Sequence, residues 1–484
     1  MIFFDVVVAR SAHTRLIGRD NQIPWRLKAD LRWFQQLTLE PSEDAPNAPN
    51  FLIMGRRTWE SLPKKPLPGR IHYIVSSTLT APELPNVYVV ASLNEALEHT
   101  RHQWSRSRCF VIGGERLYKE AIASLWCRRI YETVVHCDNE KMDIGERVSE
   151  AYFPEISDTL YQCESLGSIE KEEQLCFQRF IHTRKCPVLW WIDKSCYERD
   201  WLEHCLSRVP HYEIQPSNTL IPGAIIIANQ LANHRAMFER YEMAQVPFNL
   251  IHLSDEYLDD DYRVYTFKQC KRVFRNYLSP LFLNLPNIRS FGIGYRDQFA
   301  NQCQQLKQLP RTLVWSFAGY LKKSDRTLIC QLFERFTPYV IHETGGFNIG
   351  LLNTTEYAQL LCSSKFVLCP VGNCSLDTFR LYEACEAGAI PVTLYSNVNQ
   401  PFVRFIQNYW AMLFGVHELP FIVSHSWEEN VQKMAFYLEH PETYKELCRR
   451  CDVFWQVYKE TLQNDFSDML WKKHQTKNPT TNRQ

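Results

Sequence analysis

Short apolar runs alternate with amphipathic, helix-like stretches along most of the chain, and this alternation constrains the fold more than any other feature. In the first part of the chain the runs lie at 51–55, 71–76, 87–91, 109–114 and 130–135. Farther along they lie at 225–229, 248–253, 312–318, 338–342, 366–370 and 389–395. Such alternation is typical of strands and covering helices in α/β proteins. The sequence therefore predicts an α/β fold.

The chain is too long for one domain, since it has 484 residues and a domain holds roughly 100–200. Between the two sets of apolar runs, a polar stretch leads to Cys186 and Pro187, and a new strand pattern begins at Val188. The second part has roughly 290 residues, which is enough for two lobes. The units predicted on this basis are 1–184, 187–310, 311–475 and a polar tail, 476–484.

The balance of charge argues against two classes of partner. Lys plus Arg and Asp plus Glu both number 54, so no overall field attracts nucleic acid or an anionic membrane. The most apolar run, 220–232, is interrupted by Pro222 and is shorter than the ~20 residues that span a bilayer. The apolar N-terminal run has no basic leader, which favours a strand over a signal peptide. We expect a cytoplasmic protein that binds neither nucleic acid nor membranes.

The 17 cysteines are scattered through apolar and helical stretches, in a chain too long to need a disulfide framework. We therefore interpret them as reduced thiols. Cys448 and Cys451 form a C-x-x-C pair, but they lie in a helical pattern, and no second pair follows at zinc spacing. The sequence predicts no metal site.

One acidic residue in the first domain lies in a distinctive setting. A glycine-containing loop leads through Pro24 and Trp25 into a predicted helix that carries Asp30 and Phe34 on one face, four residues apart. A single carboxylate on an amphipathic helix is usually solvated. Four further segments change this interpretation, namely MGRRTWESL (54–62), LPGR (67–70), VSS (75–77) and VIGGERLY (111–118).

Together these segments resemble dihydrofolate reductase in their order and spacing, and the resemblance covers residues 2–184. It implies a mixed sheet flanked by helices and the reduction of 7,8-dihydrofolate to tetrahydrofolate by NADPH. Asp30 would hold the pterin and promote protonation of N5, since burial raises the pKa of a carboxyl. Thr133 would be its hydrogen-bond partner. Phe34 and Leu62 would enclose the aminobenzoyl ring, and Arg70 would bind the glutamate carboxylate.

Two predicted helix starts make up the phosphate side of the implied cofactor site. Residues 55–58 open a helix whose N-terminal amides attract phosphate, and a glycine pair, 113–114, precedes another helix start. The resemblance places Arg56 with Ser76 and Ser77 at the 2′-phosphate, which favours NADPH over NADH.

The resemblance also implies a pocket for the nicotinamide, with Ile17, Ile112 and Tyr118 as its walls. Glu115 departs from the family pattern, because it puts a negative charge beside the second helix start. The full set of cofactor residues implied is Ala9, Ile17, Gly55, Arg56, Arg57, Thr58, Ser76, Ser77, Gly113, Gly114 and Arg116.

In the second domain, a charged helix follows a buried strand within 361–395. Asp377, Arg380 and Glu383 recur every third residue, which predicts that they share one helix face. Such a face is more often a solvated surface than a site. However, Gly388 ends this helix before another buried strand, and parallel sheets bind ligands beside the C-terminal ends of their strands.

This segment resembles the donor-binding part of exostosin-like glycosyltransferases, which have two Rossmann-like lobes in the GT-B architecture. Further matching pieces lie at 248–256, 273–277, 290–299 and 315–326. The resemblance implies transfer of a sugar from a nucleotide-sugar, expected to be a UDP-sugar, to a glycan or another hydroxyl acceptor. Arginines would neutralise the leaving diphosphate without a metal, and Glu383 would hold ribose or base hydroxyls. The donor residues implied are Arg296, Arg326, Asp377, Arg380 and Glu383.

Other interpretations of the second domain remain open. Asp255 and Glu256, after a predicted strand, are candidates for the base that activates an acceptor, although each is more often structural. The domain is alternatively a catalytically inactive module that binds a glycan or a nucleotide. A thymidylate synthase fusion is disfavoured, because Cys369–Pro370–Val371 lacks the histidine and the spacing that the synthase's nucleophilic cysteine requires.

Overall fold

The computed structural model describes residues 3–42, 45–103, 107–136, 149–192, 196–323, 325–346, 349–395, 409–416 and 418–470. The chain forms two compact units that meet in sequence between Cys186 and Pro187. No helix within the described ranges is long and apolar enough to cross a membrane. The predicted polar tail, 476–484, lies outside the described residues. Both units combine helices with sheets, so the predicted α/β class is confirmed.

The first unit contains eleven strands and four helices among its described residues. The strands are β1 (Phe4–Ser11), β2 (Leu16–Arg19), β3 (Asn50–Gly55), β4 (Arg70–Val75), β5 (Val87–Val90), β6 (Cys109–Val111), β7 (Cys127–His136), β8 (Glu150–Tyr152), β9 (Tyr161–Ser165), β10 (Glu170–Glu172) and β11 (Leu175–Arg184). The helices are α1 (Lys28–Leu39), α2 (Arg56–Ser61), α3 (Leu93–Gln103) and α4 (Glu115–Ala123).

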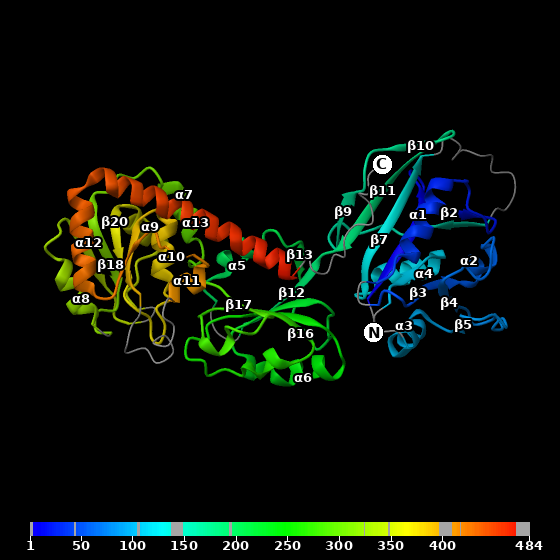
Figure 1. Cartoon of the computed structure of the whole chain (residues 1–484), viewed down its shortest axis with the longest axis horizontal. Helices are drawn as coiled ribbons and strands as arrows, with labels where there is room; N and C mark the ends of the chain where they lie inside the picture. Colours follow the sequence, from blue (N-terminus) through cyan, green and yellow to red (C-terminus); the bar gives the residue numbers. More distant parts are fainter. Residues whose placement is uncertain are drawn as a thin grey trace. The chain divides into compact units, whose positions relative to one another are not determined.

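One mixed sheet of nine strands organises this unit (Figure 1). β1 lies near its middle, parallel to both β6 and β7, and β7 pairs antiparallel with β11. From β6 the sheet continues in parallel through β3 and β4 to β5. β2 and β8 form a separate antiparallel pair.

The central strands are apolar on both faces because helices cover the sheet. Residues 51–54 of β3 are wholly buried. Helix α1 buries Trp33 and Leu37, which are four residues apart, in the same core cluster as β3. Asp30 and Phe34 lie beside this buried stripe and are only partly exposed. The amphipathic pattern of α1 therefore fixes the side from which Asp30 meets the sheet.

The second unit contains two sheets. The first has the strand order β13-β12-β14-β15-β16-β17, and the second has the order β19-β18-β20-β21-β22. In the first sheet β12, β14, β15, β16 and β17 pair in parallel, and in the second sheet β19, β18, β20, β21 and β22 pair in parallel. The first lobe has strands β12 (Cys186–Trp191), β13 (His211–Glu213), β14 (Ala224–Ala228), β15 (Phe248–His252), β16 (Cys270–Arg275) and β17 (Ile288–Ser290). The second has strands β18 (Leu313–Gly319), β19 (Tyr339–Glu343), β20 (Ser364–Leu368), β21 (Ile390–Leu394) and β22 (Ile422–Ser424).

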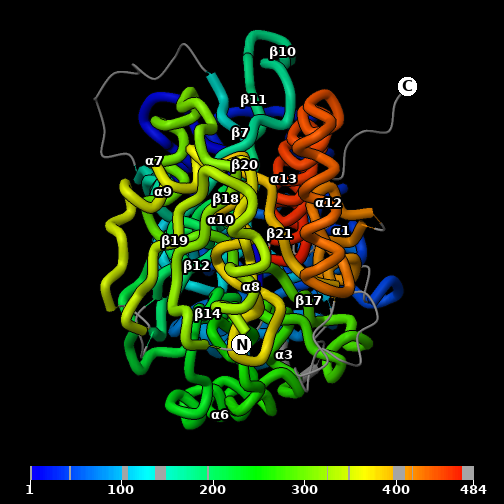
Figure 2. The backbone as a smooth tube through the Cα atoms, turned by 90° about the vertical axis from the view of Figure 1, so that its left-hand side faces the viewer, coloured from blue at the N-terminus to red at the C-terminus, as the bar shows by residue number. Residues whose placement is uncertain are grey.

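Helices cover both sheets of this unit. They are α5 (Arg199–Leu206), α6 (Arg235–Met243), α7 (Phe299–Leu306), α8 (Arg326–Phe333), α9 (Thr354–Cys362), α10 (Phe379–Glu386), α11 (Tyr409–Phe414), α12 (Trp427–Glu439) and α13 (Pro441–Leu470). Short 3-10 helices span Leu231–His234, Tyr262–Thr266 and Pro280–Phe282. α12 packs against α8 and α13, and Figure 2 shows α12 and α13 side by side. α7 packs against α9 and α10.

The 30-residue helix α13 connects the two lobes, because it packs against α12 and α10 and then against α5 (Figure 1). Trp455 stacks on Trp201 with ring centroids 5.6 Å apart. The Tyr458 hydroxyl accepts a hydrogen bond of 2.9 Å from the amide of Gly292. A Cβ at Gly292 would lie 2.3 Å from the Tyr382 hydroxyl, so this loop needs glycine to approach so closely. The C-x-x-C pair lies within α13, as its helical pattern predicts.

Candidate active sites

Asp30 lies in the first unit, where the start of α1 faces the sheet. Glu172 of β10 accepts hydrogen bonds from the amides of Lys28 and Ala29, which fixes the first turn of α1. The Thr133 hydroxyl, on β7, donates to Asp30 Oδ1 at 2.6 Å. Burial raises the pKa of Asp30, and the Thr133 hydrogen bond opposes that rise. This carboxyl therefore takes up a proton more readily than a solvated one would.

Apolar side chains that the resemblance implies for the substrate and for the nicotinamide pack against one core cluster. Phe34, Leu62 and Ile112 are partly buried and pack against the same core cluster. The Tyr118 ring lies edge-on to Phe153, with centroids 5.0 Å apart. Its hydroxyl donates to the carbonyl of Val7 at 2.7 Å, so it points toward β1.

Arg70 is a buried cation at the start of β4, where it is 6% exposed. Its Nη1 donates to the Thr38 hydroxyl at 2.7 Å, and its Nε donates to the carbonyl of Pro68 at 3.1 Å. Burial lowers its pKa. Among the described residues it has no carboxylate partner, so it is positioned to receive one from a ligand.

The two predicted helix starts of the cofactor side touch each other. The amide of Gly55, at the end of β3, donates to the carbonyl of Gly113 at 2.7 Å. Gly113 has a φ of +144°, and a Cβ there would lie 2.7 Å from the Thr58 hydroxyl. Position 113 therefore requires glycine. The contact brings the amides of α2 and of α4, which starts after Gly114, to one edge of the sheet.

The predicted phosphate-binding side chains are accessible. Arg56 is about half exposed and has a loose ion pair of 3.4 Å with Glu60. Ser76 accepts hydrogen bonds from the amides of Thr78 and Leu79, which leaves its own proton to donate. The other exposed members of the set are Arg57, Ser77 and Arg116.

Glu115, the departure from the family pattern, has a structural partner. Its carboxylate accepts a hydrogen bond of 3.1 Å from the amide of Tyr152, so it joins α4 to β8. Ile17 lies on β2, the strand that pairs with β8, and is partly buried. Ala9 lies on β1 directly beside Thr133.

In the second unit, Arg380 is part of α10, and its guanidinium lies against the C-terminal end of β18. Its Nε and Nη2 donate to the carbonyl of Ala318 at 3.1 and 2.7 Å, and its guanidinium lies 4.7 Å from the centre of the Phe317 ring. A Cβ at Gly319, where φ is +156°, would lie 2.7 Å from Nη2. Arg380 has no carboxylate partner among the described residues.

Two further cations gather beside Arg380. Arg326, which is 6% exposed, donates to the carbonyls of Tyr320 and Val371. Burial and the neighbouring Arg380 lower the pKa of Arg326 to about 10. Burial and then Arg326 also lower the pKa of Lys323. Sequence reasoning did not single out Lys323, although it lies in the matching piece 315–326. Three cations gathered in this way form a natural site for an anion.

Glu383 and Arg296 form an ion pair instead of two separate ligand contacts. Glu383 is 1% exposed, and its Oε1 accepts from Arg296 Nε at 3.0 Å. Its Oε2 accepts from the Tyr357 hydroxyl at 3.0 Å. A ribose hydroxyl that reached Glu383 would therefore replace one of these partners.

The prediction that Asp377 shares a helix face with Arg380 and Glu383 is wrong, because α10 begins only at Phe379. Before it, the Ser375 hydroxyl accepts from the amide of Asp377, which holds the chain in a turn. Asp377 is 2% exposed and forms no ion pair among the described residues. Burial raises its pKa to about 7, a hydrogen bond with Tyr382 opposes the rise, and the charge of Glu256 adds to it.

Both acidic candidates for the acceptor side are engaged. Asp255 is buried and lies 3.4 Å from Arg275. Glu256 accepts hydrogen bonds from the loop that precedes α10. Another acid, Glu198, escaped sequence reasoning because it stands alone in a polar stretch. Glu198 is 2% exposed, and burial raises its pKa to about 7, with Asp297 adding to the rise.

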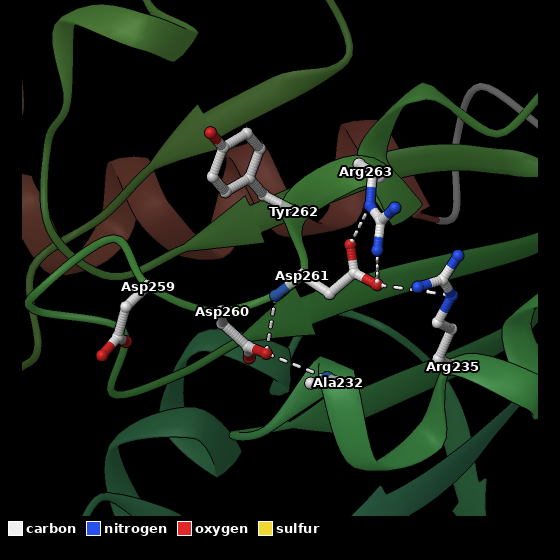
Figure 3. Close-up of a pocket in the computed structure, with 7 residues that line it drawn as sticks. All are labelled: Ala232, Arg235, Asp259, Asp260, Asp261, Tyr262 and Arg263. Carbon is white, nitrogen blue, oxygen red and sulfur yellow. Dashed lines mark hydrogen bonds and ion pairs between the residues drawn. The ribbon is translucent and has the colours of Figure 1, made fainter.

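A separate hollow of about 460 Å³ lies after β15 (Figure 3). Asp261 pairs there with Arg263 at 2.6 Å and approaches Arg235 at 3.8 Å. Asp260 accepts from the amide of Ala232 and bonds His252. The hollow is lined by three carboxylates and two arginines, and Asp260 and Asp261 are already bonded within the protein, so we assign it no ligand. Among the described residues no cluster of side chains has the composition of a metal site.

Comparison with known proteins gives two family matches. A family model described as dihydrofolate reductase matches residues 4–184, and one described as the RXYLT1 C-terminal domain matches residues 303–474. Dihydrofolate reductase of Schistosoma mansoni is 37% identical over 158 residues, which are 31% of this chain and 78% of the relative. The Drosophila melanogaster enzyme is 32% identical over 162 residues, which are 33% of this chain and 83% of the relative.

A bifunctional dihydrofolate reductase-thymidylate synthase of Daucus carota is 30% identical over 191 residues, which are 37% of this chain. The chain spans about a third of the length of that relative, since the match covers 34% of it. The two family matches support a fusion of a reductase with a glycosyltransferase-type domain.

Proposed function

Through residues 4–184 the chain belongs to the dihydrofolate reductase family, and from this premise we propose that its first unit reduces 7,8-dihydrofolate to tetrahydrofolate with NADPH. The observation that carries the proposal is the 2.6 Å hydrogen bond between Thr133 and the half-buried Asp30. In this reaction C6 of the substrate gains a hydride and N5 gains a proton. A carboxyl of raised pKa is suited to promote the protonation of N5.

The other residues bind and orient the substrate. Phe34 and Leu62 offer apolar surface to the aminobenzoyl ring, and Arg70, which has no carboxylate partner among the described residues, offers its guanidinium to the glutamate carboxylate. NADPH supplies the hydride when it is bound. The contact between Gly55 and Gly113 brings the amides at the starts of α2 and α4 to one edge of the sheet, where they are suited to bind its phosphates.

The test replaces the ionisable group of Asp30 in the full chain. Asp30→Asn keeps the size of the side chain, and we expect it to lower the rate of NADPH oxidation at neutral pH by about 100-fold, the scale of lost acid catalysis. Asp158→Asn, which removes an exposed carboxylate of the same unit, should leave the rate unchanged. An Asp30→Asn protein with the full rate would exclude Asp30 from the reaction.

For the second unit we infer transfer of a sugar from a nucleotide-sugar, expected to be a UDP-sugar, by an exostosin-like domain of GT-B architecture. The carrying observation is the group of cations formed by Lys323, Arg326 and Arg380 at the C-terminal end of β18. As the bond between the sugar and the diphosphate breaks, the diphosphate gains negative charge, which these cations stabilise. The acceptor oxygen bonds to the sugar carbon in place of the diphosphate, and its proton passes to water.

Titration of the full chain with UDP and GDP tests this site. Arg380→Ala should weaken nucleotide binding at least tenfold through the loss of charge-assisted hydrogen bonds. Arg335→Ala is the matched control, because Arg335 is an exposed cation of the same lobe that contacts Phe336. If the unsubstituted chain binds neither nucleotide, the donor site is wrong. Binding without release of UDP from UDP-sugars in the presence of hydroxyl acceptors would favour the inactive module.

A further inference from the structure

One carboxylate of the first lobe occupies a ring of hydrogen-bond donors in the second lobe. Glu256 follows β15, and the donors belong to the loop between β20 and α10. Oε1 of Glu256 accepts from the backbone amides of Asn373, Cys374 and Ser375 at 2.6, 2.8 and 3.2 Å. Oε2 accepts from Asn373 Nδ2 at 2.7 Å. Four donors therefore converge on one carboxylate.

Successive backbone amides that point at one anion form a nest, an arrangement that proteins use to bind phosphate. This nest is held by its own bonds. The amide of Gly372 donates to the carbonyl of Ser375 at 2.8 Å, and the Ser375 hydroxyl bonds the Tyr409 hydroxyl at 3.1 Å. A Cβ at Gly372 would lie 2.7 Å from Glu256 Oε1, so glycine permits the close approach of an anion. The loop therefore keeps its shape without Glu256.

The nest adjoins the cations of the donor site. Arg326 Nη2 donates at 3.0 Å to the carbonyl of Val371, directly before the nest. Its buried Nε has no hydrogen-bond partner among the described residues, which is unusual for a guanidinium that is 6% exposed. Lys323 lies near enough to Glu256 for the two charges to interact. Glu256 is thus an anion that already occupies the position where the backbone amides and the cations would bind a ligand anion.

We propose that the nest of residues 373–375 is the seat of a donor phosphate, and that Glu256 is a tethered competitor that must leave before the donor binds. This inference rests on the proposed transferase function. Its consequence is regulatory, because the same carboxylate links the end of β15 in the first lobe to the loop before α10 in the second. Binding of a nucleotide diphosphate would therefore break a link between the lobes.

The test compares Glu256→Gln and Glu256→Ala with the unsubstituted full chain, titrated with UDP, GDP and inorganic pyrophosphate. Affinity for UDP or GDP should rise about tenfold or more in both variants, because apparent affinity is reduced by the fraction of sites that are blocked. The matched control is Asp259→Asn, which removes an exposed carboxylate of the same loop. It should change affinity less than twofold.

Each other outcome has a distinct meaning. Variants that bind a nucleotide as the unsubstituted chain does, or more weakly, overturn the competitor role and leave the donor site standing. An equal gain in Asp259→Asn makes the effect one of net charge and also overturns it. A gain for pyrophosphate alone excludes a nucleotide seat. If neither the variants nor the unsubstituted chain binds a nucleotide, both this inference and the transferase proposal fail.

Hydrogen exchange on the unsubstituted chain gives an answer that does not depend on a variant. At saturating UDP, amides 373–375 should remain protected, because phosphate replaces the carboxylate. Amides of the segment 254–258 should exchange faster once Glu256 is released. Unchanged or slower exchange of that segment at saturating UDP would overturn the proposal.

Discussion

The two candidate sites treat their carboxyl groups in opposite ways. Asp30 in the first unit has one neutral partner, the Thr133 hydroxyl, and remains partly open. In the second unit Glu383 is buried with an arginine and a tyrosine, and Glu256 is surrounded by four donors. A carboxyl with one neutral partner stays available to exchange a proton. A carboxylate whose oxygens both accept hydrogen bonds has a structural role, and it contacts a ligand only when one of its partners is displaced.

Asp377 matches neither case, and the removal of its carboxyl should have the largest effect on the free energy of unfolding. It is buried without a cationic partner among the described residues, and burial raises its pKa to about 7, against an ordinary value of 3.8. The folded state therefore holds a proton that the unfolded state releases. The contribution of Asp377 to the free energy of unfolding is therefore most favourable below pH 4 and falls as the pH rises to 7, by about 4 kcal/mol at 1.36 kcal/mol per pKa unit.

Asp377→Asn should remove most of this loss, so the variant should gain stability over the unsubstituted chain at pH 8 and little at pH 4. Denaturant unfolding of the second unit at both pH values measures it. Asp325→Asn, at an exposed position of the same lobe, should show no such dependence on pH. If Asp377→Asn destabilises the protein at pH 8, the ionised carboxylate has a stabilising partner, and the contrast with Asp30 is lost.

A smaller effect is expected at Glu383. Tyr357→Phe removes the hydroxyl that donates to Glu383 Oε2 and leaves a buried carboxylate oxygen without its donor. The expected cost is about 1.5–3 kcal/mol of unfolding free energy. Tyr339→Phe is the control, since Tyr339 is a partly buried tyrosine of the same lobe whose ring stacks on Trp315. If the two variants were equally stable, the Tyr357 hydrogen bond would not stabilise Glu383, and the contrast with Asp30 would be lost.

The smallest effect is expected in the first unit. Thr133→Ala removes the hydroxyl that donates to Asp30 and should lower the reductase rate roughly tenfold, the size of one such bond. Because this bond favours the ionised form, its loss should raise the pKa of Asp30 and move the alkaline limb of the pH–rate profile upward. Thr183→Ala on β11 serves as the control. A profile that does not move would show that Thr133 only packs beside Asp30.

The sequence was most informative where function depends on local order. The apolar runs predicted most strands of both units, and the spacing of Asp30 and Phe34 placed them beside the buried stripe of α1. β16 was missed because Lys271 and Arg272 interrupt its apolar pattern, and β22 because it has only three residues.

Other features of the second site depend on contacts between distant segments, which periodicity does not reveal. The turn before α10 is held by Ser375 and by Glu256, which lies 119 residues away from Ser375. Helical spacing therefore placed Asp377 on a helix that begins two residues later. Lys323 and Glu198 escaped notice because their importance comes from neighbours brought by the fold.

Helix α13 also bears on how the second unit is made. The sheet of the first lobe ends at Ser290, but Trp201 and Phe274 in that lobe are covered by Trp455 and Phe466 of α13. During synthesis, this apolar surface is exposed until the ribosome has added about 180 further residues, which takes roughly 10–40 seconds at 5–20 residues per second. The first lobe is therefore encoded early and completed last, so a nascent chain depends on protection from aggregation throughout the synthesis of the second lobe.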